Sequence, residues 1–328
     1  MKRSIGWDNG AVVAVDQRAL PDELKELRLT DTEQVVAAIQ SLAIRGAPAV
    51  GVAGALGVAL AAHLADADGA AGEAAVRAQA RRIAEARPTA VNLERGVQRA
   101  LNRLPDGKEA VLAEALSMLA EDERVNRAAS HRAAEFLRDC LPSTPLRVLT
   151  HCNTGRLATA AWGTALGAIK ELASAGLVAE VLAGETRPLL QGARLTVWEL
   201  AEAGIPHRLC VDAAGPAALA AGMVDCVVVG ADRIAANGDV ANKIGTYALA
   251  VAAQRAGVPF VVVAPESTLD PRTRSGADIR IEERHADEVT HHAGIRVAAR
   301  NTRVFNPAFD VTPFELVTAV ITETRTMR

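Results

Sequence analysis

The sequence is poor in aromatic residues and has almost no excess charge. Only 3% of its 328 residues are Phe, Trp or Tyr, too few to build a surface on which nucleic-acid bases stack. Lysine and arginine number 36 and aspartate and glutamate 39, so the net charge is −3. No overall field therefore attracts a polyanion or an anionic membrane. We expect no nucleic-acid partner, and we expect any small anion to be bound by a local site.

Cysteine is also scarce. Four cysteines, none of them in a Cys-X-X-Cys pair, are too few for a disulfide scaffold and favour a reduced, cytoplasmic protein. The stretch from Gly46 to Ala65 carries no formal charge and is long enough for a membrane span. It is mostly Gly and Ala, however, and its few large residues recur at helical spacing. We therefore expect a buried helix of a globular core and no membrane segment.

Two kinds of periodicity divide the chain. The first twenty residues alternate weakly around Ala11–Val15 and predict a short strand or hairpin. Residues 31–140 have a helical pattern, with a helix N-cap within Thr30–Glu33 and a long helix over 108–137. After Pro142 short apolar runs alternate with helical stretches, which indicates a different architecture.

The second half predicts a parallel sheet. Runs that are apolar through most of their length are typical of strands buried on both faces. The predicted strands are 147–150, 178–182, 208–211, 224–229 and 260–263. The predicted helices are 157–172, 191–203, 216–221, 241–255 and, last, 313–324. We predict an α/β fold: a small, mainly helical N-terminal domain over 1–142, then a Rossmann-like doubly wound parallel-sheet domain over 143–328.

A charged or reactive side chain follows each of the five predicted strands. These residues are Cys152, Glu185, Asp212, Asp232 and Glu266. Ligands of open parallel sheets bind beyond the carboxyl ends of the strands, so this edge is a candidate site. Helix capping and loop solvation are the alternative reasons for such residues. His151 would face away from Cys152 on a strand, so their adjacency does not imply a Cys–His dyad.

Three segments have the composition of phosphate-binding loops. Asn153–Gly155 opens a predicted helix, whose backbone N–H groups attract anions. Ile44–Pro48 and Arg87–Thr89 each place an arginine in a turn, and a guanidinium binds phosphate with two hydrogen bonds. Ordinary turns and surface arginines would look the same, and a lone cysteine such as Cys152 can be a small buried hydrophobe.

Eight short blocks in fixed order are more specific than any of these signals alone. They read RGAPAVG at 45–51, RPTAVNL at 87–93, THCNTG at 150–155, GETRP at 184–188, QGARLT at 191–196, GADRI at 230–234, NGD at 237–239 and NKIGT at 242–246. With Asp16–Arg18 before them and Asn306–Asp310 after them, the chain resembles the methylthioribose-1-phosphate isomerase family over nearly its whole length.

This resemblance implies an enzyme that converts an aldose 1-phosphate into the ketose 1-phosphate in methionine salvage. It implies no metal or organic cofactor, a sugar phosphate as substrate and usually a homodimer. By motif matching, Asp232 would be the acid and Cys152 the base or charge stabiliser. The substrate would be held by Arg45, Gly46, Ala47, Arg87, Gln191, Asn242 and Lys243. Because these residues come from both predicted domains, we expect both domains to contribute to the site.

Three departures from the family pattern leave the C5 substituent of the sugar open. They are Arg156, Asp212–Pro216 and Leu189–Leu190. One alternative is an isomerase of ribose 1,5-bisphosphate, for which Arg156 would suit a second phosphate, or of 5-deoxyribose 1-phosphate. A second alternative is a non-catalytic regulatory subunit of the initiation factor that exchanges guanine nucleotide, which belongs to the same superfamily. Such subunits typically lack the Cys–Asp pair that stands here as Cys152 and Asp232.

Overall fold

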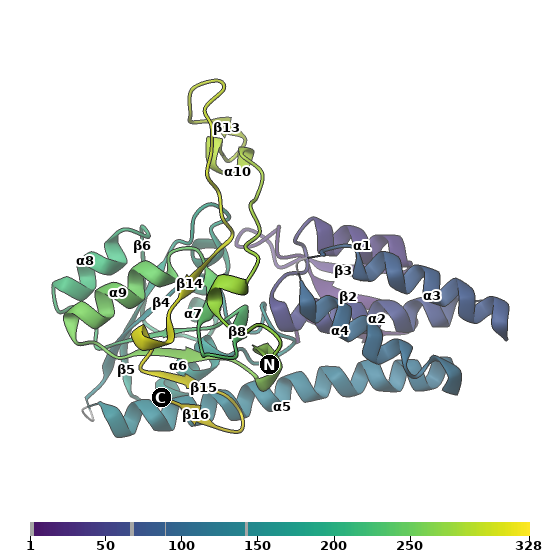
Figure 1. Ribbon diagram of the computed structural model, residues 1–328, viewed down its shortest axis with the longest axis horizontal. Coiled ribbons are helices and arrows are strands. Elements are labelled where there is room, and N and C mark those ends of the chain that lie inside the picture. The colour runs from purple at the N-terminus through teal and green to yellow at the C-terminus, as the bar shows by residue number, and fades with distance from the viewer. Residues whose placement is uncertain (1–2, 66–68, 89, 142–143) are drawn as a thin grey trace. The chain divides into compact units, whose positions relative to one another are not determined.

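The chain folds into two compact units (Figure 1). The computed structural model describes residues 3–65, 69–88, 90–141 and 144–328. One unit comprises Met1–Arg127 with Thr154–Gly163, and the other comprises Ala128–Asn153 with Thr164–Arg328. The boundary predicted between 142 and 143 lies outside the described residues. The long helix α5 (Lys108–Cys140), predicted over 108–137, runs through the border between the units.

The first unit begins with the hairpin that the alternating residues predict. Its antiparallel sheet contains β1 (Ile5–Asp8), β2 (Ala11–Val15) and β3 (Glu26–Leu29). Helix α1 (Thr32–Gln40) follows, and the side chain of Asp31 accepts the backbone N–H of Gln34. This contact confirms the predicted N-cap.

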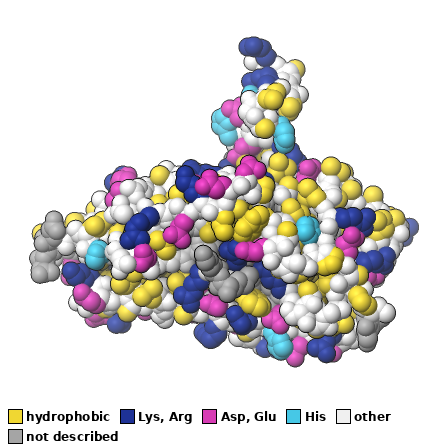
Figure 2. Space-filling model, turned by 180° about the vertical axis from the view of Figure 1, so that it is seen from behind, with side chains coloured by type: hydrophobic (Ala, Val, Ile, Leu, Met, Phe, Trp, Pro, Cys, Tyr) yellow, Lys and Arg dark blue, Asp and Glu magenta, His cyan; other side chains and the backbone are white. Residues whose placement is uncertain are grey.

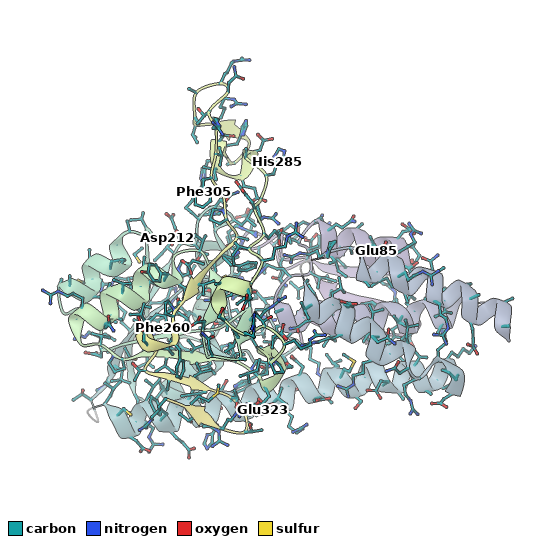
Figure 3. All side chains as sticks on the ribbon, viewed as in Figure 1. Glu85, Asp212, Phe260, His285, Phe305 and Glu323 are labelled. Carbon is teal, nitrogen blue, oxygen red and sulfur yellow. The ribbon has the colours of Figure 1, made fainter. Side chains whose placement is uncertain are left out.

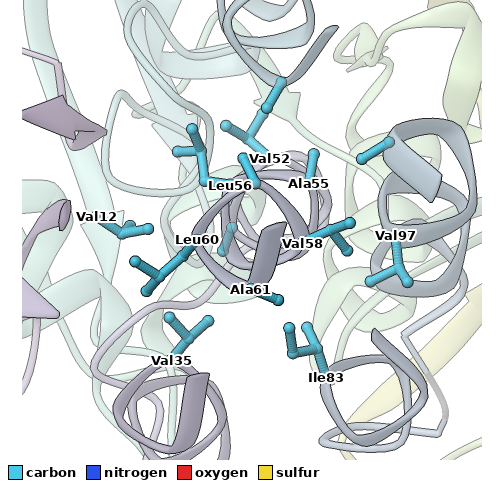
Figure 4. Packing of buried hydrophobic residues seen from close by; sticks show 14 of the residues in the cluster. Val12, Val35, Val52, Ala55, Leu56, Val58, Leu60, Ala61, Ile83 and Val97 are labelled. Carbon is cyan, nitrogen blue, oxygen red and sulfur yellow. The ribbon is translucent and has the colours of Figure 1, made fainter. Parts of the chain in front are cut away.

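Helix α2 (Ala47–Leu64) is the centre of this unit. By length and composition it could cross a membrane, but 78% of it is buried inside the protein, which confirms the predicted buried helix. It packs against α1, α3 (Ala70–Ala84), α4 (Val91–Leu101) and the small sheet. Figure 4 shows Leu56 and Leu60 of α2 among side chains from these neighbours. Small residues let the helices approach closely: a Cβ added to Gly96 of α4 would lie 2.0 Å from the carbonyl oxygen of Gly51.

The second unit contains a seven-stranded sheet. In spatial order its strands are β16 (Thr326–Met327), β15 (Ala319–Ile321), β10 (Phe260–Val263), β7 (Cys226–Val229), β4 (Leu146–Thr150), β5 (Val178–Gly184) and β6 (His207–Cys210). All neighbours are parallel except β15 and β16. The five predicted strands are therefore confirmed, and β15 extends the parallel part.

Helices cover both faces of this sheet, as predicted. Val148 of β4 belongs to a core formed with α5, α6 (Ala165–Ser174) and α7 (Val197–Glu202). Its neighbour Leu149 points to the opposite face and belongs to a core formed with α8 (Ala214–Ala220) and α9 (Thr246–Ala256). From the central β4 the chain first adds β5 and β6 on one side and then β7, β10 and β15 on the other.

The remaining elements of this unit are short. A four-stranded sheet contains β11 (Leu269–Asp270), β8 (Arg233–Ala235), β9 (Val240–Lys243) and β14 (Phe309–Thr312). Figure 1 shows an arm that projects from the unit, with α10 (Asp287–Thr290) and the hairpin of β12 (His291–His292) and β13 (Ile295–Arg296). Figure 3 marks His285 and Phe305 on it. The short helical turns are η1 (Leu104–Asp106), η2 (Gly192–Thr196, a π-helix), η3 (Glu266–Thr268), η4 (Gly276–Asp278) and η5 (Phe314–Leu316).

The predicted last helix over 313–324 is wrong. This segment forms η5 and then strand β15, which pairs in parallel with β10. Its apolar spacing is too short to distinguish the two periods, and the buried, β-branched Val320 and Ile321 favour a strand. The helix predicted over 157–172 begins only at Ala165, after Gly163 at a φ of 98°. The helix predicted over 241–255 begins at Thr246, because β9 occupies its first residues.

We expect Gly96→Ala to destabilise the first unit. The added Cβ would collide with the backbone of α2, which cannot rotate away as a side chain does. The loss should therefore reach or exceed the roughly 1–3 kcal/mol typical of overpacking, measured by urea unfolding. Gly6→Ala is the matched control, since its Cβ would meet only Val13 at 3.7 Å. Equal stability of the two variants would contradict the close contact between α2 and α4.

Candidate functional site

The two residues predicted to be catalytic follow neighbouring strands. Cys152 lies just beyond β4 and Asp232 just beyond β7, and these strands pair in parallel with Leu149 opposite Val227. The strand order reverses at this pair. In open α/β sheets the crevice at such a reversal is the usual place for a ligand. The topology therefore puts both residues at the position where a binding site is expected.

Cys152 is held in an unusual backbone conformation. Its φ is 63°, in the left-handed region that side chains other than glycine rarely adopt, and its side chain is buried. Its N–H donates to Oγ of Thr186 at 3.0 Å, and its carbonyl oxygen accepts the hydroxyl of Thr196 at 2.5 Å. Thr186 is itself left-handed, at 68°. Unfavourable backbone geometry that surrounding contacts maintain is common at functional sites.

Asp212 maintains the loop that carries Thr186. Its carboxylate accepts the N–H groups of Thr186 at 2.8 Å and Arg187 at 2.7 Å. The predicted edge residue Asp212 thus has a structural partner in the loop after β5. The same loop contacts the next motif, because the Cα of Gly192 packs so closely on Gly184 that a Cβ would lie 1.7 Å from its carbonyl oxygen.

Gln191 precedes that close contact and is only 5% exposed. Its Oε1 has no hydrogen-bond partner among the described residues of the chain. Buried polar atoms are normally satisfied, so one without a partner suits a ligand atom that the structure does not contain.

His151 connects the end of β4 to the motif after β9. Its Nε2 donates to the carbonyl oxygen of Ile244 at 2.8 Å, and its Nδ1 lies 3.8 Å from Oδ1 of Asp212. Burial lowers the pKa of His151, so the ring is neutral at neutral pH. The sequence indicated only that His151 faces away from Cys152. Its role as a connector depends on a contact between distant segments that no local pattern encodes.

Asp232 lies beside the strand that carries the other predicted ligands. Its N–H donates to the carbonyl oxygen of Ala241 at 2.9 Å. Asn242 is buried and donates to Oγ of Thr246 at 3.0 Å. Lys243 donates to the carbonyl oxygen of Ala308 at 2.9 Å and lies over the ring of Phe309. The contact of Asp232 with Ala241 links the loop after β7 to β9, the strand that carries Asn242 and Lys243.

Glu266, also predicted at this edge, has a structural role. It pairs with Arg325 at 3.0 Å and accepts the hydroxyls of Thr322 and Thr324. Its partners hold the turn between β15 and β16.

Asp310, by contrast, was not predicted as a single site residue. It accepts the N–H groups of Gly245 at 2.7 Å and Tyr247 at 3.2 Å, and burial raises its pKa to about 6.

The predicted phosphate residues of the first unit lie at the start of α2. Gly46 has a φ of 98°, and a Cβ there would be 2.2 Å from the carbonyl oxygen of Ala158. Gln17 bridges the same two segments: its Nε2 donates to the carbonyl oxygen of Leu157 at 2.7 Å, and its Oε1 is 3.5 Å from Arg45. No side chain caps the helix at Gly46. Pro48 has no N–H and the N–H of Ala49 donates to the carbonyl oxygen of Ala158 at 3.3 Å, so within the first turn the N–H of Ala47 suits an anion.

Two more arginines of this unit are partly or wholly buried. Arg87 is half-buried and lies in the segment that connects α3 to α4. Thr89 of the same motif lies outside the described residues. Arg156 is almost completely buried. The burial of Arg156 distinguishes it from a surface arginine, whereas Arg87 is partly exposed in a turn. Elsewhere on the face that Figure 2 shows, Lys and Arg side chains are interspersed with Asp and Glu.

Comparison with known proteins gives the same family by three routes. The sequence profile described as "Initiation factor 2 subunit family" matches residues 43–327. A Nocardia farcinica protein named probable bifunctional methylthioribose-1-phosphate isomerase/methylthioribulose-1-phosphate dehydratase is 63% identical over 98% of this chain. The chain spans only 58% of that relative. A methylthioribose-1-phosphate isomerase of Chloroflexus aurantiacus is 48% identical over 98% of this chain and 94% of its own length.

Some relatives carry other names. A 5-deoxyribose 1-phosphate isomerase of Moorella thermoacetica is 48% identical over 99% of this chain and 93% of its own length. Among solved structures, 5-methylthioribose 1-phosphate isomerase from Pyrococcus horikoshii has a TM-score of 0.92 at 38% identity, covering 100% of this chain and 92% of its own. A structure described as initiation factor eIF-2B subunit delta, from A. fulgidus, has a TM-score of 0.89 at 43% identity, covering 100% and 96%.

The raised pKa of Asp310 predicts a pH-dependent contribution to stability. Unfolded, its carboxyl ionises near 3.8, and folded it ionises at about 6. At a pH between these two values the unfolded chain has released this proton while the folded chain still holds it. The contribution of Asp310 to the free energy of unfolding therefore decreases as pH rises from about 4 to about 6 and is constant above that. The difference in unfolding free energy between wild type and Asp310→Asn should therefore fall across this window in urea titrations. The exposed Asp22→Asn is the control, and a difference that rises with pH would contradict the assignment.

Proposed function

The chain belongs to the initiation factor 2 subunit family, and we propose that it isomerises methylthioribose 1-phosphate to methylthioribulose 1-phosphate in methionine salvage. The observation that carries this proposal is the position of Cys152 and Asp232 beyond adjacent strands at the reversal of strand order. The strand order also supports a Rossmann-like assignment for the sheet. We expect the enzyme to be a cytoplasmic homodimer.

The first chemical task is to open the sugar ring. A sugar phosphorylated at C1 is a glycosyl phosphate, and its ring does not open as freely as that of a hemiacetal. We assign to Asp232 the donation of a proton to the ring oxygen, which becomes the C4 hydroxyl as its bond to C1 breaks. Asp232 is half-buried, so part of it stays accessible at the edge of the sheet.

The second task is to move hydrogen from C2 to C1. C1 is reduced and C2 is oxidised within one molecule, so the electrons balance without an external redox partner. In one route Cys152 removes the C2 proton as a base, and the proton is returned to C1. In the other a hydride moves directly from C2 to C1 while Cys152 stabilises the charge. In both routes the proton of the C2 hydroxyl is lost as the ketone forms.

The remaining residues hold the substrate in place. We assign the phosphate to Arg45, to the first turn of α2 at Gly46 and Ala47, and to Arg87. We assign the sugar hydroxyls to Gln191, Asn242 and Lys243. The buried Oε1 of Gln191, which lacks a partner among the described residues, supports its assignment. Fixing both ends of an open-chain sugar supplies the orientation that hydrogen transfer requires.

A turnover assay by NMR, without added metal, tests the reaction. We expect the wild type to form the ketose from methylthioribose 1-phosphate. Cys152→Ser and Asp232→Asn should each lower kcat by about 100-fold or more, as expected for loss of a proton-transferring group. Near-normal turnover by Asp232→Asn would refute its role as the acid. In D2O, deuterium at C1 of the product would indicate the proton-transfer route, and its absence a hydride shift.

Two other sugar phosphates belong in the same assay. The Moorella thermoacetica relative supports 5-deoxyribose 1-phosphate, and the buried Arg156 would suit ribose 1,5-bisphosphate. Turnover of only one of these would keep the mechanism and change the substrate. The likeness to the A. fulgidus structure supports the regulatory alternative. That alternative requires that none of the three sugars is converted.

Arg45→Ala should weaken the phosphate contact. A hydrogen bond to a charged group is worth about 1.5–3 kcal/mol, so kcat/KM should fall by roughly 10- to 100-fold, mainly through a higher KM. Arg82→Ala is a matched control, because Arg82 is an exposed arginine of the same unit that pairs with Glu33. Unchanged KM in Arg45→Ala, or an equal loss in Arg82→Ala, would contradict the assignment.

A further inference from the structure

A buried ion pair lies in the second unit close to Cys152. Lys170 of α6 and Glu199 of α7 are 8% and 1% exposed, and Nζ is 3.2 Å from Oε2. Removing two charges from water is costly, and apolar side chains of similar size often give equal stability. Stability alone therefore gives little reason for charges at this place, and the contacts of the pair indicate another role.

The second carboxylate oxygen of Glu199 leads to the cysteine loop. Its Oε1 accepts one N–H of the Asn153 side chain at 2.9 Å. Asn153 immediately follows Cys152 and is buried. The same amide nitrogen is 3.4 Å from Oγ of Thr196, which in turn donates its only hydrogen to the carbonyl oxygen of Cys152 at 2.5 Å. The donors and acceptors in this series of hydrogen bonds match one another without a conflict.

The hydrogen-bonded side chains of Glu199, Asn153 and Thr196 act on one side of Cys152, and Thr186 acts on the other. Thr186 binds the N–H of Cys152, whereas Thr196 binds its carbonyl oxygen and Glu199 fixes the next side chain. The left-handed backbone of Cys152 is thus held at both of its peptide groups. Such contacts fix the Cα–Cβ bond that carries the thiol, because this bond follows the backbone.

We propose that Lys170, Glu199 and Thr196 are positioning residues that fix the direction of the Cys152 thiol through the side chain of Asn153 and the Cys152 carbonyl. They do not touch the substrate. Lys170 pairs with the buried Glu199, Oε1 of Glu199 orients the Asn153 amide, and Thr196 completes the contact with the backbone. This inference rests on the proposed function for the role of Cys152, but the orientation of the thiol can be measured without any substrate.

Thr196→Val removes the hydroxyl at nearly constant volume. We expect kcat to fall roughly 10- to 100-fold with little change in KM, because a small displacement of a reacting group has effects of that size. Alkylation of Cys152 by iodoacetamide in the free protein, followed by peptide mass spectrometry, should become faster as the buried thiol is released. Thr196→Ser, which keeps the hydroxyl, should restore both readouts.

Thr32→Val is the matched control for loss of a buried threonine hydrogen bond. Thr32 donates to Gln79 at 2.9 Å in the first unit, outside the site. The Thr32→Val substitution should lower the melting temperature without changing kcat or the alkylation rate. If Thr196→Val behaves like this control, losing stability but keeping both readouts, the positioning role is wrong and the contact is only structural.

A double substitution tests the ion pair independently of folding. Lys170→Met with Glu199→Leu replaces the pair by apolar side chains of similar volume, so neither charge is left buried and unpaired, and the melting temperature is measured to separate lost stability from lost positioning. We expect kcat to fall and Cys152 alkylation to change as in Thr196→Val. A stable double variant with wild-type values of both would overturn the proposal. If wild type converts no sugar phosphate, the proposed function fails, and the alkylation rates alone still decide the positioning role.

Discussion

A sheet with helices on both faces leaves only its ends for polar chemistry. The inner strands β4, β7 and β10 are apolar through most of their length, because side chains on both of their faces enter a core. Charged and reactive groups are therefore confined to the loops beyond the carboxyl ends. The strand order reverses beside β4. Cys152 and Asp232 follow the two adjacent strands at this reversal. The other features of the site serve to fix these loops.

Local patterns were sufficient for most of the fold. The buried strands, the hairpin and the long helix each have a clear period, whereas Val320 and Ile321 lie in a segment too short to have one. The polar residues after the strands indicated where the site lies. Motif matching was needed to distinguish Cys152 and Asp232 from Glu266, which is bound by Arg325 in the structure.

What the sequence could not show is how the site is held together. The left-handed backbone of Cys152, the contact of His151 with Ile244 and the pair of Lys170 with Glu199 all join segments far apart in the chain. No local propensity encodes them, since each depends on the completed tertiary structure. Their residues are ordinary in type, and only their burial and their partners distinguish them.

The division of the chain has a consequence for any attempt to separate its parts. Residues 154–163 follow directly after Asn153, yet they belong with the first unit. Gln17, Gly46 and Asp122 contact this segment, and the Asp122 carboxylate accepts the N–H of Ala160 at 2.7 Å. A single cut near residue 142 would separate residues 154–163 from the residues of the first unit that they contact. The two units are therefore interlaced along the chain, and any continuous stretch that contains all of one unit also contains part of the other.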